Sequence, residues 1–306
     1  MEIAEFPVIA DFVSVAIGRR KHAESGKQIL NTLAPSRHAT ARSVATNGIN
    51  MHMVSAGDGP PLTFIHGLGW DHEMWLPALN RYAGRYRTFA GDSRGHGLSD
   101  KPDGPYTMTH FADDWAGALK AVSALPGCIV GLSQGGMVAQ ALAIAAPELV
   151  SCLVLVSTTC RASPDTSANM SDRLESMRKS GARAGAEIAA TSIFSEGFRT
   201  ANPDYIDTFI QARTAQPQEP LISAMAALSD FDYRSGLEKL DLPTLVIAGL
   251  EDTLTPPNAV REVATHIPGA ELVEMPGAGH IIPAEQPEAF YETIDTFLSQ
   301  HYAATN

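Results

Sequence analysis

The sequence predicts an α/β fold, in which a mostly parallel β-sheet is flanked by helices and carries a helical cap insertion. The first observation is that six short apolar runs recur along the chain, with stretches of helical periodicity between them. Most of these runs do not alternate with polar residues, which is typical of strands buried on both faces of a parallel sheet. The second observation is a long gap between the fourth and fifth runs, where helical patterns occur without a comparable strand.

The elements follow in order along the chain. Residues 1–40 predict an N-terminal helical extension, because apolar side chains such as Ile9, Phe12 and Val13 fall at helical spacing. The alternating segment that begins at residue 41 predicts a hairpin that turns at Asn47-Gly48. The six apolar runs are residues 62–67, 87–92, 128–133, 152–158, 243–250 and 270–277. We therefore predict a core of residues 41–159 and 243–306, with a helical cap of residues 160–242.

The composition limits the kinds of partner and the cellular location that we expect. The 306-residue chain has a formal net charge of −12, which disfavours nucleic acids and anionic membranes as partners. Its three cysteines, Cys128, Cys152 and Cys160, show neither a disulfide nor a metal pattern. The N-terminus lacks the features of a signal peptide, and no run reaches the roughly 18 apolar residues of a membrane span. We expect a soluble cytoplasmic protein with a small-molecule substrate, and a homodimer could form through the N-terminal extension.

One serine lies where a nucleophile would be expected. The segment Gly131-Leu132-Ser133-Gln134-Gly135 matches G-x-S-x-G between an apolar strand and an amphipathic helix. Such a strand-to-helix corner pushes the serine hydroxyl out of the end of the sheet, and the neighbouring glycines allow close backbone approach. We therefore predict that Ser133 is a nucleophile.

A serine hydroxyl needs a base, and the expected order along the chain is serine, acid, histidine. His280 lies in a glycine-rich loop after the last apolar run, whereas His266 lies in a helical pattern and His301 near the end of the chain. Asp252 directly follows the run 243–250, and the adjacent Glu251 is the alternative acid. We predict Asp252 as the acid and His280 as the base.

The backbone N–H groups of Leu68 and Gln134 are predicted to form an oxyanion hole. His66 is interpreted as a structural loop residue. The predicted pocket residues are Trp70, His72, Met74, Trp75 and Met137. Candidate cap residues for the roof of the pocket are Phe194, Phe198, Tyr205, Phe209, Met225 and Phe231. A solvated surface accounts best for the arginines of the same region, which are Arg161, Arg173, Arg178, Arg183, Arg199 and Arg213.

Four motifs in this order resemble the α/β-hydrolase family over roughly residues 41–302. They are "HGLGW" (66–70), "GDSRGHGLSD" (91–100), "GLSQGG" (131–136) and "GLEDTLTPP" with "GAGHIIPAEQPEAF" (249–257 and 277–290). The resemblance implies the same triad and oxyanion groups, with Asp92, Arg94, Gly95 and His96 as a scaffold beneath the site. The segment that begins with the third motif is similar to the enol-lactonase and small carboxylesterase branch.

The resulting hypothesis is a serine hydrolase that cleaves a carboxylic ester or lactone through an acyl-enzyme, with no metal or organic cofactor. The alternative is a C–C bond hydrolase, or a cofactor-free lyase or oxygenase, in which His280 acts as a base without a covalent serine intermediate. A serine at position 133 argues against dehalogenases and epoxide hydrolases, which carry an aspartate there. A non-enzymatic receptor on the same fold is the third hypothesis.

Overall fold

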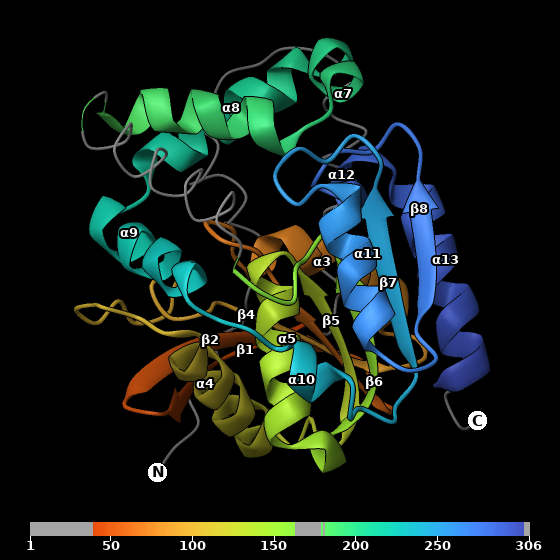
Figure 1. Ribbon diagram of the computed structural model, residues 1–306. Helices are drawn as coiled ribbons and strands as arrows, with labels where there is room; N and C mark the ends of the chain where they lie inside the picture. The colour runs from red at the N-terminus through yellow and green to blue at the C-terminus, as the bar shows by residue number, and fades with distance from the viewer. Residues whose placement is uncertain (1–38, 163–178, 180, 303–306) are drawn as a thin grey trace.

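The computed structural model describes residues 39–162, 179 and 181–302, which form one eight-stranded sheet with helices on both faces (Figure 1). The strands are β1 (Thr40–Thr46), β2 (Ile49–Ala56), β3 (Pro61–Ile65), β4 (Arg87–Gly91), β5 (Gly127–Leu132), β6 (Val150–Val156), β7 (Thr244–Gly249) and β8 (Glu271–Met275). The core helices are η1 (His72–Trp75), α3 (Leu76–Tyr82), α4 (Met108–Ala121), α5 (Gln134–Ala145), η2 (Pro147–Leu149), α10 (Arg234–Leu237), α11 (Pro257–His266), α12 (Ile282–Glu285) and α13 (Pro287–His301).

The sheet is parallel except at one end. Its strand order is β1-β2-β4-β3-β5-β6-β7-β8, and the strands from β4 to β8 in this order pair in parallel. β2 is antiparallel to both β1 and β4. Each of the six predicted runs forms one of the parallel strands, so that prediction is confirmed. Because the strands run in parallel, the loops that follow them meet at one edge of the sheet.

The predicted hairpin is also confirmed. β1 and β2 are joined by Asn47 and Gly48, and Thr46 pairs with Ile49 across the turn. Asn47 has a φ of 41° and Gly48 a φ of 78°. Two successive residues with positive φ define the tight turn that matches the twist of a hairpin, and Asn-Gly adopts it at low cost.

Two hydrophobic clusters hold helices against the two faces of the sheet. One cluster contains buried side chains of α4, α5 and α11, and the other contains those of α3 and α13. Figure 1 shows α5 and α11 on one side of the sheet and α13 on the other. β5 is buried along its whole length, because both of its faces are covered. This burial explains why its sequence is continuously apolar.

The cap rises above the edge where the parallel strands end (Figure 1). It contains a helical stretch at residues 181–193, followed by α7 (Glu196–Ala201), α8 (Pro203–Ala215), α9 (Gln218–Ala226) and η3 (Ala227–Ser229). Its two ends meet at a bridge between Arg161 and Asp232. Beyond this bridge, α10 packs against α5 and α11, so the last ten residues of the predicted insertion lie on the core.

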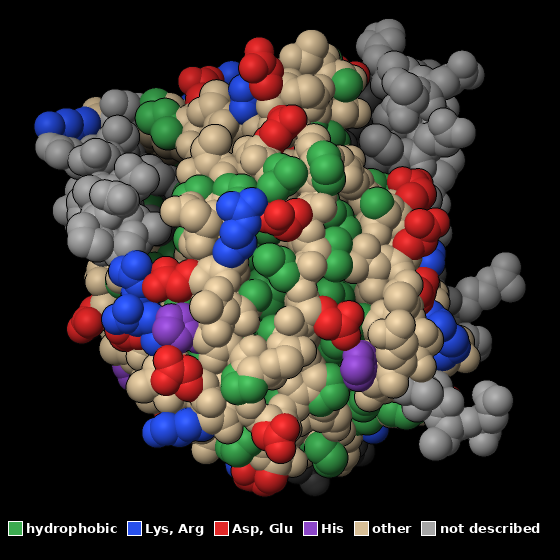
Figure 2. Space-filling view, turned by 45° about the vertical axis from the view of Figure 1, so that its right-hand side comes forward, with side chains coloured by type: hydrophobic (Ala, Val, Ile, Leu, Met, Phe, Trp, Pro, Cys, Tyr) green, Lys and Arg blue, Asp and Glu red, His purple; other side chains and the backbone are tan. Residues whose placement is uncertain are grey.

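Hydrophobic, acidic and basic side chains are interspersed on the face of the molecule that Figure 2 shows. Among the described residues, no helix has both the length and the hydrophobicity needed to cross a bilayer. Of the predicted N-terminal helical extension of residues 1–40, residues 1–38 lie outside the described part of the chain, and Thr40 already belongs to β1. The homodimer that this extension could form stays a prediction.

The prediction that Trp75 and Met74 help to wall the pocket is wrong for Trp75 and finds no support for Met74. Trp75 is fully buried in the cluster beneath α3 and α13, with its ring 5.2 Å from that of Phe64 and 6.3 Å from that of Phe290. Met74 packs partly buried against the same cluster. Both side chains belong to the short helix η1 and pack toward the core. Their sequence distance from the loop 66–70 does not indicate this direction.

We predict that Trp75→Ala lowers the free energy of unfolding by about 3–5 kcal/mol, because it leaves a large cavity between stacked rings. Denaturant unfolding measures this change, and Trp75→Phe serves as the control that keeps an aromatic ring. A loss below about 1 kcal/mol would contradict the core position of Trp75.

Candidate active site

Ser133 occupies a strained corner between β5 and α5. Its backbone has a φ of 55° and a ψ of −118°, a conformation that costs a non-glycine residue on the order of 1–3 kcal/mol. Backbone contacts hold it there, since the Ser133 N–H donates to the Val156 carbonyl at 2.8 Å. The Thr158 hydroxyl donates to the Ser133 carbonyl, also at 2.8 Å. Tertiary contacts therefore impose this backbone conformation at the carboxyl end of β5.

The glycines around Ser133 are required by close backbone contacts. A Cβ on Gly131 would lie 2.4 Å from the Gly135 carbonyl oxygen, and one on Gly135 would lie 2.2 Å from the Ile65 carbonyl oxygen. A Cβ on Gly136 would lie 2.7 Å from the Thr158 side chain. Real Cβ atoms are not found at such distances, so the G-x-S-x-G-G pattern reflects packing as well as chemistry.

His280 and Asp252 are joined by a direct hydrogen bond. The distance from Nδ1 of His280 to Oδ2 of Asp252 is 2.8 Å, and both side chains are buried. With Nδ1 donating to the carboxylate, Nε2 is the imidazole nitrogen that can take a proton. Asp252 follows β7 and His280 follows β8, and the two residues come together at the sheet edge as predicted.

Thr255 is a third member of this network that the sequence reasoning missed. Its hydroxyl donates to Oδ2 of Asp252 at 2.6 Å and lies 3.1 Å from Nδ1 of His280. The N–H groups of Thr255 and Leu254 donate to the other carboxylate oxygen at 2.9 and 2.8 Å. These contacts fix the carboxylate in the plane where it meets the imidazole. The E-D-T-L-T order after the strand, with a hydroxyl three residues beyond the acid, is a signal that could have pointed to it.

Ser133 and His280 both line one cavity. Its wall also includes Leu68, Trp70 and Met137 of the core, so two of the predicted pocket residues lie there. The remaining wall residues are Gly67, Leu132, Thr159, Arg161, Ile193, Arg213, Leu228, Phe231, Leu254 and Thr255. The lining is mostly apolar with a few convergent polar groups, as is usual for small-molecule sites.

Gln134 lies beside the cavity rather than in its wall. Its side chain is buried and its amide nitrogen is 3.4 Å from the Ala224 carbonyl of the cap. Its backbone N–H begins α5 directly after Ser133, where a helix N-terminus favours negative charge. The use of this N–H, and of the Leu68 N–H, as oxyanion donors stays a prediction.

His66 is structural, as the sequence analysis inferred. Its Nδ1 is 2.7 Å from the Gly67 carbonyl, and its Nε2 accepts the Ser93 N–H at 2.9 Å. Burial lowers the pKa of His66, which keeps the ring neutral and able to accept at Nε2. The loop that carries Leu68 is thereby anchored to the turn after β4.

The prediction that His72 helps to wall the pocket finds no support. Its backbone N–H and its Nδ1 both lie within 2.8 Å of Oδ1 of Asp92, while the other Asp92 oxygen accepts the Leu98 N–H at 2.7 Å. His72, Asp92 and His52 form the one cluster of possible metal ligands among the described residues, with ligand atoms within 4.8 Å of one another. Because the carboxylate oxygens already accept these hydrogen bonds, the cluster serves to fasten two loops.

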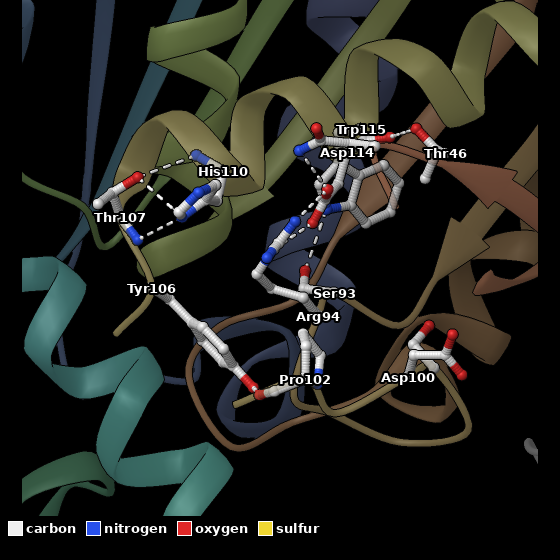
Figure 3. Close-up of polar contacts among 12 residues, drawn as sticks. Thr46, Ser93, Arg94, Asp100, Pro102, Tyr106, Thr107, His110, Asp114 and Trp115 are labelled. Atoms are coloured by element: carbon white, nitrogen blue, oxygen red, sulfur yellow. Dashed lines mark hydrogen bonds and ion pairs between the residues drawn. The ribbon is translucent and has the colours of Figure 1, made fainter. Parts of the chain in front are cut away.

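The D-x-R-G-H-G stretch forms the predicted scaffold. Arg94 is buried and donates from Nε and Nη2 to the two carboxylate oxygens of Asp114, both at 2.6 Å (Figure 3). In the same view Trp115 donates its indole N–H to the Ser93 hydroxyl at 3.0 Å. A paired, buried arginine of this kind ties the turn after β4 to α4 and leaves neither charge unpaired.

Most of the aromatic residues proposed for the pocket roof pack on one another instead. Phe194, Phe198, Tyr205 and Phe209 form a cluster of ring contacts with centroids 5.2 to 5.7 Å apart. Of the candidate roof residues, Phe231 alone belongs to the cavity wall among the described residues. The helical spacing of these aromatic residues therefore reflects packing within the cap.

The interpretation of the cap arginines as a solvated surface is wrong for Arg213. This residue is only 6% exposed and lies in the cavity wall. Arg161 also lines the cavity, where its Nε donates to Glu262 at 2.7 Å. Arg183 is exposed, whereas Arg199 is half-buried and donates from Nη1 to the Phe194 carbonyl at 2.6 Å. Arg173 and Arg178 lie outside the described residues.

The sheet topology, the serine corner and the Asp–His pair define an α/β hydrolase. Residues 60–287 match the model of the family described as "alpha/beta hydrolase fold", and the chain belongs to this family. It is 29% identical over 261 residues to 3-oxoadipate enol-lactonase 2 of Acinetobacter baylyi, covering 85% of this chain and 96% of that protein.

Solved structures give the same result. The chain is similar to a thermophilic esterase from Thermogutta terrifontis, with a TM-score of 0.78, 30% identity, and coverage of 85% of this chain and 97% of the esterase. It is equally similar in fold to the enol-lactonase from Burkholderia xenovorans LB400, with a TM-score of 0.78, 28% identity, and coverage of 84% and 99%. These relatives are consistent with the enol-lactonase and small-esterase branch.

We predict that Thr255→Val slows the reaction of the serine with a fluorophosphonate probe by about 10-fold, because the Asp252–His280 pair loses a contact that orients it. Thr255→Ser keeps the hydroxyl and should react within about 2-fold of the wild type. An unchanged rate for Thr255→Val in a folded protein would show that Thr255 does not position the pair.

Acid should destabilise the fold through His96. Burial, with a contribution from His66, lowers the pKa of His96 to about 3. Between the ordinary histidine pKa near 6.5 and this value the unfolded chain binds a proton that the folded chain does not, so stability falls as the pH falls. Unfolding free energies measured between pH 7.5 and pH 5 should decline less steeply for His96→Asn than for the wild type. Equal slopes would contradict this assignment.

Proposed function

We propose that the protein is a serine hydrolase that cleaves a carboxylic ester or lactone through an acyl-enzyme intermediate. The observation that carries the proposal is the hydrogen bond between His280 and Asp252, together with the presence of Ser133 and His280 in the wall of one cavity. A histidine oriented by a carboxylate can activate a serine hydroxyl as a nucleophile.

The proposed mechanism has two halves. His280 takes the Ser133 proton at Nε2 while the hydroxyl oxygen attacks the substrate carbonyl, and Asp252 stabilises the imidazolium that forms. The N–H groups of Leu68 and Gln134 donate hydrogen bonds to the carbonyl oxygen as negative charge develops on it. The bond from the carbonyl carbon to the alkoxide then breaks, and the imidazolium gives its proton to the leaving oxygen. In the second half His280 takes a proton from water, which attacks the acyl carbon, and the bond to Oγ of Ser133 breaks as Oγ takes the proton back.

The cavity supports a small, largely apolar acyl group. Leu132, Met137, Leu228 and Phe231 line the cavity together with Ser133, and so does Trp70 of the proposed oxyanion loop. The relatives named above, two enol-lactonases and an esterase, support ester and lactone carbonyls as the reacting group. For a lactone both product groups remain in one molecule, so the product is a single hydroxy or keto acid.

The competing chemistry uses His280 as a base without a covalent serine. A C–C hydrolase, lyase or oxygenase of this kind would still need the imidazole and the cavity. It would not need the Ser133 hydroxyl to form a bond with substrate, so removal of that hydroxyl distinguishes the two proposals.

We predict that Ser133→Ala lowers turnover of p-nitrophenyl esters and lactones of graded acyl length by at least about 10³-fold, because the acyl-enzyme cannot form. Ser157→Ala is the matched control. Ser157 follows β6 in the same sheet, also has a positive φ of 46°, and lies outside the cavity wall. This control should keep the wild-type rate within a few-fold.

Full turnover by Ser133→Ala would overturn the covalent mechanism in favour of a histidine base. If wild-type protein cleaves a dienone while every ester and lactone in the panel is inert, the proposed substrate class is wrong.

A further inference from the structure

The C-terminal end of cap helix α8 contacts the loop that carries the proposed oxyanion donor. Arg213 donates from Nη1 to the Leu68 carbonyl at 3.2 Å. Gln216, which follows the helix, donates from its amide nitrogen to the Gly69 carbonyl at 2.8 Å. The ring of Phe209, one turn earlier on the same helix, lies 5.5 Å from that of Trp70. Three side chains of one helix end therefore contact three consecutive loop residues.

The guanidinium of Arg213 fits against a glycine that has no room for a side chain. Gly69 has a φ of 71°, and a Cβ placed on it would lie 1.2 Å from Nη1 of Arg213 and 2.0 Å from its Cζ. The guanidinium thus occupies the volume that any side chain at position 69 would need. The glycine of the H-G-L-G-W motif is required both by its left-handed backbone and by this contact.

Residues of the loop itself hold the carbonyl that precedes these two. His66 and Trp70 both contact the Gly67 carbonyl, through the imidazole Nδ1 at 2.7 Å and the backbone N–H at 3.1 Å. Three successive carbonyls therefore have donors, the first from the loop itself and the next two from the cap. The Leu68 N–H belongs to the same planar peptide as the Gly67 carbonyl, and the cap contacts the carbonyls of the two peptides that follow.

This arrangement bears on catalysis because an oxyanion donor acts only when it points at the developing charge. Removing one such donor typically lowers the rate by about 10²–10³-fold, and a misplacement near 1 Å by about 10²-fold. The peptide whose carbonyl Arg213 contacts joins the peptide of the Leu68 N–H at the Leu68 Cα, so a displacement of the first would also move the second.

We propose that Arg213 and Gln216 are positioning residues that couple the cap to the oxyanion hole, an inference that rests on the function proposed above. Through the carbonyls of Leu68 and Gly69 they hold the two peptides that follow the Leu68 N–H, and thereby limit movement of the adjoining peptide that carries it. The cap thereby completes the catalytic site in addition to covering it.

The test compares Arg213→Met and Gln216→Met with Arg213→Lys, which keeps a charged donor. Arg183→Met is the matched control, since Arg183 is an exposed cap arginine that pairs with Glu187 within its own helix. Two readouts are needed: hydrogen–deuterium exchange of the segment 66–75, and the acylation rate with an activated p-nitrophenyl ester. Thermal unfolding identifies any variant that fails to fold.

We expect faster exchange in the loop for Arg213→Met, together with an acylation rate lowered about 10–100-fold and a KM within about 3-fold of the wild type. Gln216→Met should show a smaller loss, Arg213→Lys a partial recovery, and Arg183→Met no change in either readout.

Unchanged loop exchange in both Met variants would overturn the coupling, whatever the rates. Faster exchange without slower acylation would overturn the positioning role. If wild-type protein acylates with no ester or lactone while Arg213→Met loosens the loop, the proposed function fails and the dependence of the loop on Arg213 is still established.

Discussion

The backbone of Ser133 is the constraint on which the rest of the site depends. A serine with a φ of 55° is stable here only because its N–H and carbonyl are held by Val156 and Thr158 of the neighbouring strand and loop. The same corner requires glycine at positions 131 and 135, where a side chain would meet backbone oxygens. The sheet thus stores strain at the point where it presents a hydroxyl, which is a recurrent feature of functional sites.

The cap is fastened to the loops that meet at this sheet edge. The Ile193 carbonyl accepts the N–H of His280, and the Ser192 carbonyl accepts the Thr253 hydroxyl beside the acid. Glu285 receives N–H groups from both Ser195 and Gly279, which joins the cap to the histidine loop. With the contacts from α8 to the loop 66–70, the cap meets the loops that carry Asp252, His280 and the proposed oxyanion donor Leu68. Its insertion between β6 and β7 is therefore linked to the geometry of the whole site.

The sheet, the corner at Ser133 and the Asp252–His280 contact could be predicted from the sequence because each leaves a local signal. Contiguous apolar residues mark strands covered on both faces, and Ser133, Asp252 and His280 each follow such a run. Residues whose roles depend on tertiary direction were not predictable in the same way. Trp75, at the end of the short helix η1, packs into the core cluster. Arg213 is buried because its helix lies on the oxyanion loop, and no pattern in its own segment distinguishes it from a surface arginine.

The most direct test is a crystal structure of the protein after reaction with an alkyl fluorophosphonate, whose phosphoryl oxygen imitates the tetrahedral oxyanion. The expected result is a bond from phosphorus to Oγ of Ser133, with Nε2 of His280 toward the same centre and the phosphoryl oxygen between the N–H groups of Leu68 and Gln134. A phosphorus atom attached to another residue, or an imidazole of His280 directed away from an adduct on Ser133, would contradict the proposed site.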